Sequence, residues 1–158
     1  MKKNPLLLLL LLVFAFAVSS CDKKEDPAPP PVVGRWNTDR IILSGFPAPY
    51  QGLNGDFSPT LFSIESSLNL LADKKFTYRF SNGVRVTTGG GTWEYSGTSL
   101  TLNYDDGNQE TYTYEQPRAG EQELKGTQEA VTLPVENPTT GADEEARGQA
   151  QFVYRKQQ

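Results

Sequence analysis

Residues 33–158 predict an all-β domain, built as an antiparallel up-and-down meander of about 8–10 strands. Two observations lead to this fold class. Short runs of alternating apolar and polar residues follow one another along the region, and a period of two is typical of strands with one buried face. Turn-forming residues separate the runs about every 8–12 positions. Because no segment has a sustained helical period, we expect helix in this domain only as a single turn within residues 44–60.

The first expected strand contains Trp36, and the central strands follow it. Apolar residues share one parity from Phe62 to Leu70 and again from Phe76 to Phe80. Two further alternating runs lie at residues 93–95 and 100–104, and Tyr112 and Tyr114 mark the next strand. Side chains two positions apart point to the same face of a strand, so each run predicts one apolar face.

Turn-forming residues stand between these runs. Asn82-Gly83 favours a two-residue type I′ hairpin, because both residues tolerate positive φ. The other expected turns are Asp73-Lys74, Ser96-Gly97 and Asp105 to Asn108.

The C-terminal third is less regular. Leu124 is the centre of a weak strand, and residues 131–135 alternate more clearly. Residues 136–148 are polar and acidic, which predicts a long mobile loop. Phe152 and Tyr154 then mark the last strand.

A second long connection, residues 44–60, combines glycine and proline with three aromatic residues. Glycine and proline interrupt regular structure, whereas the aromatic side chains favour burial. Long connections of this kind inside a compact domain are often lids or binding loops. An Ω-loop whose aromatic side chains cover one end of the fold explains the same residues.

The N-terminus predicts export. Lys2 and Lys3 precede an unbroken apolar run of 13 residues, Leu6 to Val18. This run is shorter than the roughly 20 residues of a membrane span and fits the core of a signal peptide. Residues 18–21, Val-Ser-Ser-Cys, resemble the lipobox of bacterial lipoproteins. The resemblance implies that residues 1–20 are a cleaved signal and that Cys21 is acylated and anchors the chain to a membrane.

Residues 21–32 are then expected to form the lipidated cysteine and a disordered tether. The tether is charged and then proline-rich, with almost no apolar surface to bury. The charged run after Cys21 resembles the signal that sends some lipoproteins to the outer face of the outer membrane, although a solvated tether explains it equally well. We expect a lipid-anchored protein of the bacterial cell envelope, in the outer membrane, with the face undetermined.

Composition narrows the functional classes. The chain contains no histidine and one cysteine, so Ser-His-Asp catalysis, Cys-His catalysis and imidazole metal ligands are excluded. The net charge of −4 lacks the basic footprint of nucleic-acid binding. We therefore expect no enzyme activity, no metal, no cofactor and no nucleic-acid partner, and we expect a monomer.

A second resemblance begins at Gly34-Arg35-Trp36. A Gly-x-Trp motif in the first strand, before a long loop and a β-meander, resembles the lipocalins, and the likeness covers residues 33–156. It implies a barrel in which the first and last strands pair. It also implies that Trp36 closes one end and that an arginine near the C-terminus, here Arg155, packs over the indole. A disulfide and a C-terminal helix, which many lipocalins have, are missing here.

The aromatic residues of the central strands are the candidate barrel interior. They form an ordinary core or line a cavity, and tyrosine hydroxyls around an apolar cavity suit a lipid, a pigment or a sugar. Two functions remain open: binding of a small apolar or amphipathic ligand, or an envelope interaction module with a filled core and long contact loops. The candidate residues of the barrel interior are Phe76, Tyr78, Phe80, Trp93, Tyr95, Tyr112 and Tyr114.

Overall fold

The computed structural model describes residues 28–158. The expected signal peptide, Cys21 and the first part of the expected tether lie outside the described residues. Ten strands and two short 3₁₀ turns, η1 (Tyr50–Leu53) and η2 (Pro59–Phe62), make up the fold. In chain order the strands are β1 (Gly34–Ser44), β2 (Gly55–Phe57), β3 (Glu65–Leu70), β4 (Lys75–Ser81), β5 (Val86–Ser96), β6 (Ser99–Tyr104), β7 (Gln109–Glu115), β8 (Glu123–Gly126), β9 (Glu129–Glu136) and β10 (Asp143–Lys156).

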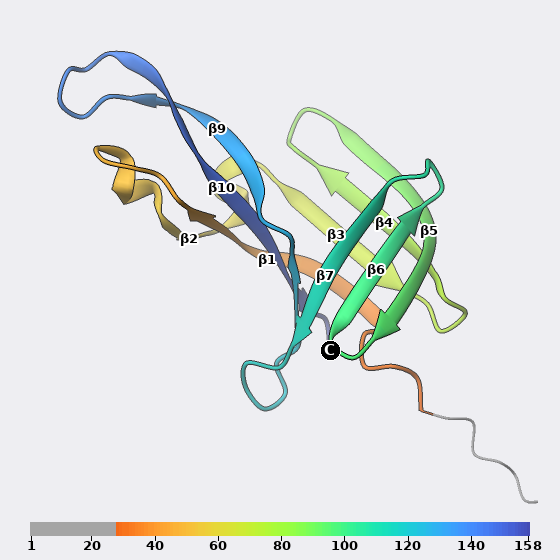
Figure 1. Ribbon diagram of the computed structural model, residues 1–158. Helices are drawn as coiled ribbons and strands as arrows, with labels where there is room; N and C mark the ends of the chain where they lie inside the picture. Colours follow the sequence, from red (N-terminus) through yellow and green to blue (C-terminus); the bar gives the residue numbers. More distant parts are fainter. Residues whose placement is uncertain (1–27) are drawn as a thin grey trace, which may run out of the picture.

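The strands form one closed antiparallel barrel (Figure 1). Eight of them follow the order β1-β3-β4-β5-β6-β7-β8-β10, and β10 pairs back with β1. The closing pair runs from Trp36 opposite Lys156 to Ser44 opposite Gln149, with an irregularity between Thr38 and Arg40. The predicted all-β meander and the predicted pairing of the first and last strands are both confirmed.

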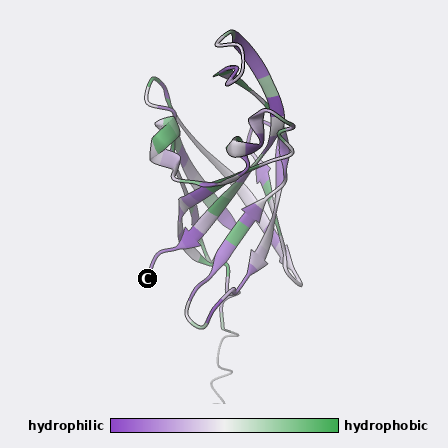
Figure 2. Cartoon of the chain, turned by 90° about the vertical axis from the view of Figure 1, so that its left-hand side faces the viewer, coloured by the Kyte–Doolittle hydropathy of each residue, from purple (hydrophilic) through white to green (hydrophobic). Residues whose placement is uncertain are grey.

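The two remaining strands, β2 and β9, pair with the parts of the long strands β1 and β10 that project beyond the barrel. The first part of β1 pairs with β3 and its later part pairs with β2. The last part of β10 pairs with β8 and its first part pairs with β9. The β9–β10 hairpin therefore projects past the barrel (Figure 1), and its tip is hydrophilic (Figure 2). The ten segments thus correspond to eight long strands. Two of these are interrupted: one consists of β2 and β3, which both lie beside β1, and the other of β8 and β9, which both lie beside β10.

Most predicted turns lie where expected, but one has a different type. Ser96 pairs with Ser99 around a two-residue turn, and residues 105–108 connect β6 with β7. The β4–β5 turn has four residues rather than two, because Ser81 pairs with Val86. The Asn82 side-chain oxygen accepts hydrogen bonds from the backbone N–H groups of residues 84 and 85, at 3.3 and 2.9 Å. Only the glycine of the predicted Asn-Gly pair has positive φ.

The prediction of a mobile loop over residues 136–148 is wrong. Residues 143–148 belong to β10 and pair with β9, so only residues 137–142 form a turn. Ala146 is buried, and a side chain at Gly148 would collide with the ring of Phe46. In the first half of β10, the small residues Ala146 and Gly148 alternate with charged residues, so this part of the strand looks polar in the sequence.

The connection from residue 44 to residue 60 packs beside this hairpin. Phe46 belongs to a buried cluster with Ile41, Leu43, Ala146 and Ala150, which is separate from the main core of the barrel. The expected single helical turn is present as η1, and a second 3₁₀ turn, η2, ends beyond the predicted boundary. The connection therefore fits the predicted Ω-loop, in which aromatic side chains cover apolar surface.

The main core fills one end of the barrel. Val32, assigned above to the tether, is fully buried in it because the Trp36 side chain packs on the entering chain. Among the described residues, all strand pairings and both buried clusters lie within residues 32–156. Within residues 28–158, no helix is long and apolar enough to cross a membrane.

Candidate functional site

Trp36 closes the packed end of the barrel. Its indole N–H donates a hydrogen bond of 2.8 Å to the carbonyl of Val32, and its ring meets Tyr114 edge-on at 6.3 Å between centroids. The Lys156 ammonium lies 5.7 Å from the Trp36 ring centroid. A side chain at Gly34 would reach within 2.8 Å of the Lys156 stem, so the glycine of the Gly-x-Trp motif leaves room for this lysine.

The prediction that Arg155 covers Trp36 is wrong, because Lys156 takes that place. Strand alternation is the reason: Trp36 stands directly opposite Lys156, whereas Arg155 stands opposite Asn37 on the other face of the sheet. From there the Arg155 guanidinium lies 3.1 Å from Asp39. The expected cation–π closure exists, but one residue further along β10.

Trp93 seals the same end of the barrel in a similar way. Its indole N–H donates to the carbonyl of Leu71 at 3.0 Å, and the Lys74 ammonium lies 3.9 Å from the ring centroid. Each tryptophan therefore has a backbone acceptor for its N–H and an ammonium over its ring. With this end filled, a ligand would have to reach the interior from the other end.

An ion-pair cluster joins β1, β8 and β10 on the outside of the barrel. The Arg40 guanidinium donates to both carboxylate oxygens of Glu123, at 2.8 and 2.9 Å, and also lies 3.2 Å from Asp56. Glu123 is only 2% exposed. The bonds from Arg40 lower the pKa of Glu123 although burial opposes this shift. The cluster is structural, because it faces away from the barrel interior.

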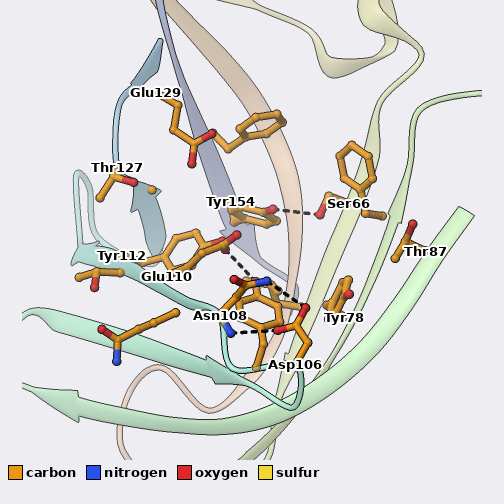
Figure 3. Close-up of a pocket in the computed structure, with 17 residues that line it drawn as sticks. Ser66, Tyr78, Thr87, Asp106, Asn108, Glu110, Tyr112, Thr127, Glu129 and Tyr154 are labelled. Carbon is orange, nitrogen blue, oxygen red and sulfur yellow. Dashed lines mark hydrogen bonds between the residues drawn. The ribbon is translucent and has the colours of Figure 1, made fainter. Parts of the chain in front are cut away.

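The other end of the barrel holds a cavity of about 520 Å³ (Figure 3). Strands β3 to β8 and β10 all contribute to its wall. Its aromatic lining consists of Tyr78, Phe80, Tyr104, Tyr112, Phe152 and Tyr154. Its polar lining near the β6–β7 turn and the β8–β9 junction includes Asp106, Asn108, Gln109, Glu110, Thr127 and Glu129.

Tyrosine hydroxyls and one carboxylate form a network in this cavity. The hydroxyls of Tyr104 and Tyr112 both donate to the same oxygen of Glu110, at 2.7 and 2.6 Å. The hydroxyls of Tyr154 and Ser66 lie 2.9 Å apart (Figure 3). Burial is the main cause that raises the pKa of Tyr104 and of Tyr112, so both phenols stay protonated and keep donating.

The glycine run at residues 89–91 shapes the wall behind Tyr78. In the β4–β5 pair, Gly89 stands opposite Tyr78 and Gly91 stands opposite Phe76. A side chain at Gly89 would lie 2.6 Å from the Tyr78 ring. The rings of Phe76 and Tyr78 therefore lie over glycines of β5, where any side chain would collide with them.

Three of the seven candidate interior residues line the cavity: Tyr78, Phe80 and Tyr112. The other four belong to the packed half and do not line it; they are Phe76, Trp93, Tyr95 and Tyr114. Alternation identifies the inward face of a strand, but it does not say at which height along the barrel a side chain lies.

Sequence reasoning missed the other residues of the cavity wall, among them Tyr104, Glu110, Phe152 and Tyr154. A signal for Glu110 was present, because it shares the parity of Tyr112 and follows the β6–β7 turn directly. The expected lid over residues 44–60 is not observed, since none of these residues lines the cavity. Within residues 28–158, no group of three or more Cys, Asp or Glu side chains is placed to hold a metal ion.

An eight-stranded up-and-down barrel that is filled at one end and hollow at the other has the architecture of a ligand-holding barrel. A sequence model of the lipocalin-like domain matches residues 32–117, more than half of the chain. The protein therefore belongs to the lipocalin-like domain family. The match covers β1 to β7, and β8 to β10 complete the barrel. Comparison with curated protein sequences finds no match.

Proposed function

We propose that the protein binds one small amphipathic ligand in the open half of its barrel. The cavity is the observation that supports this function most directly. Its volume of about 520 Å³ falls within the roughly 300–1,000 Å³ of typical ligand pockets. Aromatic side chains form much of its wall, and polar groups gather near the turns. This arrangement suits a molecule with an apolar body and a polar group.

The alternative, an interaction module with a filled core, has less support. Only one half of the barrel interior is filled, and the other half holds the cavity. The lipocalin-like family typically binds ligands without catalysis, and the tyrosine network lacks the histidine or thiol that acyl-transfer chemistry commonly uses. We therefore propose a binding protein rather than an enzyme, acting as a monomer.

We also propose that the barrel is anchored in the bacterial cell envelope, at the outer membrane, through an acylated Cys21. The support is the sequence of residues 2–21: two lysines, an apolar run of signal-peptide length, and a lipobox-like Val-Ser-Ser-Cys. Two or three acyl chains hold a protein firmly on a bilayer, because each buried methylene contributes about 0.8 kcal/mol.

A cavity-blocking variant tests the binding function. Thr87 lines the cavity, and its neighbour Thr88 faces the opposite side of β5 and is equally exposed. Thr87→Trp should narrow the cavity and obstruct ligand entry, whereas Thr88→Trp is the matched control. The probe is the neutral fluorophore N-phenyl-1-naphthylamine, added to residues 22–158 of each variant.

We expect one probe per wild-type or Thr88→Trp molecule and at least tenfold weaker binding to Thr87→Trp. Native mass spectrometry of the wild-type domain, purified without detergent, should show a retained small molecule or the same 1:1 probe complex. Equal binding of the probe by both tryptophan variants would place the binding site outside the cavity and contradict the proposal.

A further inference from the structure

The charges on the cavity wall have a single sign. Asp106, Glu110 and Glu129 are among its lining residues, whereas no lysine or arginine of the part of the chain that the structure describes lines it. Lys74 and Lys156 lie over tryptophans at the packed end, away from the cavity. Within residues 28–158, a ligand in the cavity therefore meets negative charge without a neutralising cation in the cavity wall.

The phenols and side-chain amides around Glu110 are already engaged as hydrogen-bond donors. The hydroxyls of Tyr104 and Tyr112 donate to one oxygen of Glu110, which leaves its other oxygen without a protein donor. The side-chain amide of Asn108 donates to Asp106 at 3.0 Å, and that of Gln109 donates to Asn103 at 2.8 Å. Neutral hydroxyls such as those of Tyr78 and Thr111 also line the cavity, but its charged groups are all carboxylates. Together with the aromatic rings, these carboxylates complement a positively charged ligand.

We propose that the cavity selects an amphipathic organic cation, with its ammonium group at Glu110 and its apolar body among the aromatic rings. This inference rests on the proposed binding function and specifies its ligand class. Ammonium groups are attracted both by carboxylates and by the faces of tyrosine and phenylalanine rings. Tyr78 and Tyr104 present such rings beside Glu110, at 5.3 Å between their centroids.

The same wall disfavours anionic lipids such as fatty acids. A carboxylate entering the cavity would lose its hydration and face like charges with no partner of opposite sign, and both effects oppose its charged form. We expect a neutral alcohol to bind with an affinity between those of the cation and the anion, because it gains the apolar contacts but no attraction between charges. Three molecules that share one tail and differ only in the head group therefore separate the possibilities.

The experiment measures binding of decyltrimethylammonium, decanol and decanoate to residues 22–158 by competition with N-phenyl-1-naphthylamine. All three are used below their micellar concentrations. We expect decyltrimethylammonium to displace the fluorophore at concentrations at least tenfold lower than decanol, and decanoate to be the weakest. Glu110→Gln should reduce the ratio of cation affinity to alcohol affinity by about tenfold. Glu94→Gln, an exposed position on the outside of β5, is the matched control and should keep the ratio.

The outcomes separate this inference from the proposed function. Absence of displacement by all three molecules, together with absence of fluorophore binding, would overturn both. Binding of decanol or decanoate as tight as that of the cation would leave a ligand-binding barrel and overturn its selectivity for cations. An unchanged ratio in Glu110→Gln would overturn the assignment of the ammonium site to Glu110.

Discussion

Removing the Arg40 side chain should destabilise the barrel strongly. Glu123 is nearly inaccessible to water, and both of its oxygens accept hydrogen bonds from Arg40. Arg40→Ala leaves this buried carboxylate with Arg155 alone, whose guanidinium lies 3.6 Å away and is partly exposed. The variant therefore weakens the contacts among β1, β8 and β10, where the barrel closes.

The expected size follows from the burial of the pair. Breaking a buried ion pair by removing one partner typically costs about 3–5 kcal/mol, and the remaining contact with Arg155 points to the lower end of this range. For a domain with a urea m-value of about 1–3 kcal/mol/M, a loss of 3 kcal/mol lowers the unfolding midpoint by at least about 1 M.

Tryptophan fluorescence is a suitable assay, because Trp36 and Trp93 are both buried in the main core. The control is Arg79→Ala, which removes an ion pair with Glu65 at 3.3 Å whose side chains are 48% and 74% exposed. Exposed pairs contribute about 0–1 kcal/mol, so this variant should unfold close to the wild type. Equal free energies of unfolding for Arg40→Ala and Arg79→Ala would refute the reasoning.

Three further predictions concern acid stability, strand packing and the anchor. Because the folded-state pKa of Glu123 is lowered, its stabilisation is present above the unfolded pKa of about 4.3 and is lost as the pH falls through the folded value. The urea midpoint should therefore fall less steeply below pH 4.5 in Glu123→Gln than in the wild type. Gly91→Ala should cost about 3 kcal/mol in thermal unfolding, because its methyl group would collide with the Asn103 carbonyl, whereas Gly52→Ala, in open space, should change stability by less than about 1 kcal/mol. A melting temperature for Gly91→Ala equal to that of Gly52→Ala would argue against close packing at this point. Cys21→Ala should abolish metabolic labelling with a fatty-acid analogue, and persistent labelling would contradict the lipobox interpretation.

The sequence predicted the central barrel strands well because buried large side chains recur at every second position in the packed half of the barrel. From Leu68 to Tyr114, large apolar residues alternate with polar ones, and the turns between them contain glycine, asparagine or aspartate. The first half of β10 escaped prediction for a physical reason. Its buried face uses Ala146 and Gly148, and the large side chain that covers them, Phe46, comes from a segment about a hundred positions away.

The candidate site was predicted only in part, for a related reason. Alternation gave the inward face of each strand, but the height of a side chain along the barrel depends on the stagger between strands. Tyr112 therefore lines the cavity while Tyr114, two residues later, belongs to the packed end. The choice between Arg155 and Lys156 depends on the register of one strand pair, which a single sequence does not reveal.

The chain enters the barrel at its packed end, so the cavity opens on the side opposite to the N-terminal segment. Lys156 donates a hydrogen bond of 2.6 Å to the Pro31 carbonyl, and Val32 is fixed under Trp36. With an acylated Cys21 ten residues upstream, the filled end would face the bilayer and the mouth would face away from it. A proline-rich tether of this length spans at most about 30 Å. The ligand would then be exchanged with the aqueous space or with a second protein opposite the mouth, rather than drawn from the leaflet that holds the anchor.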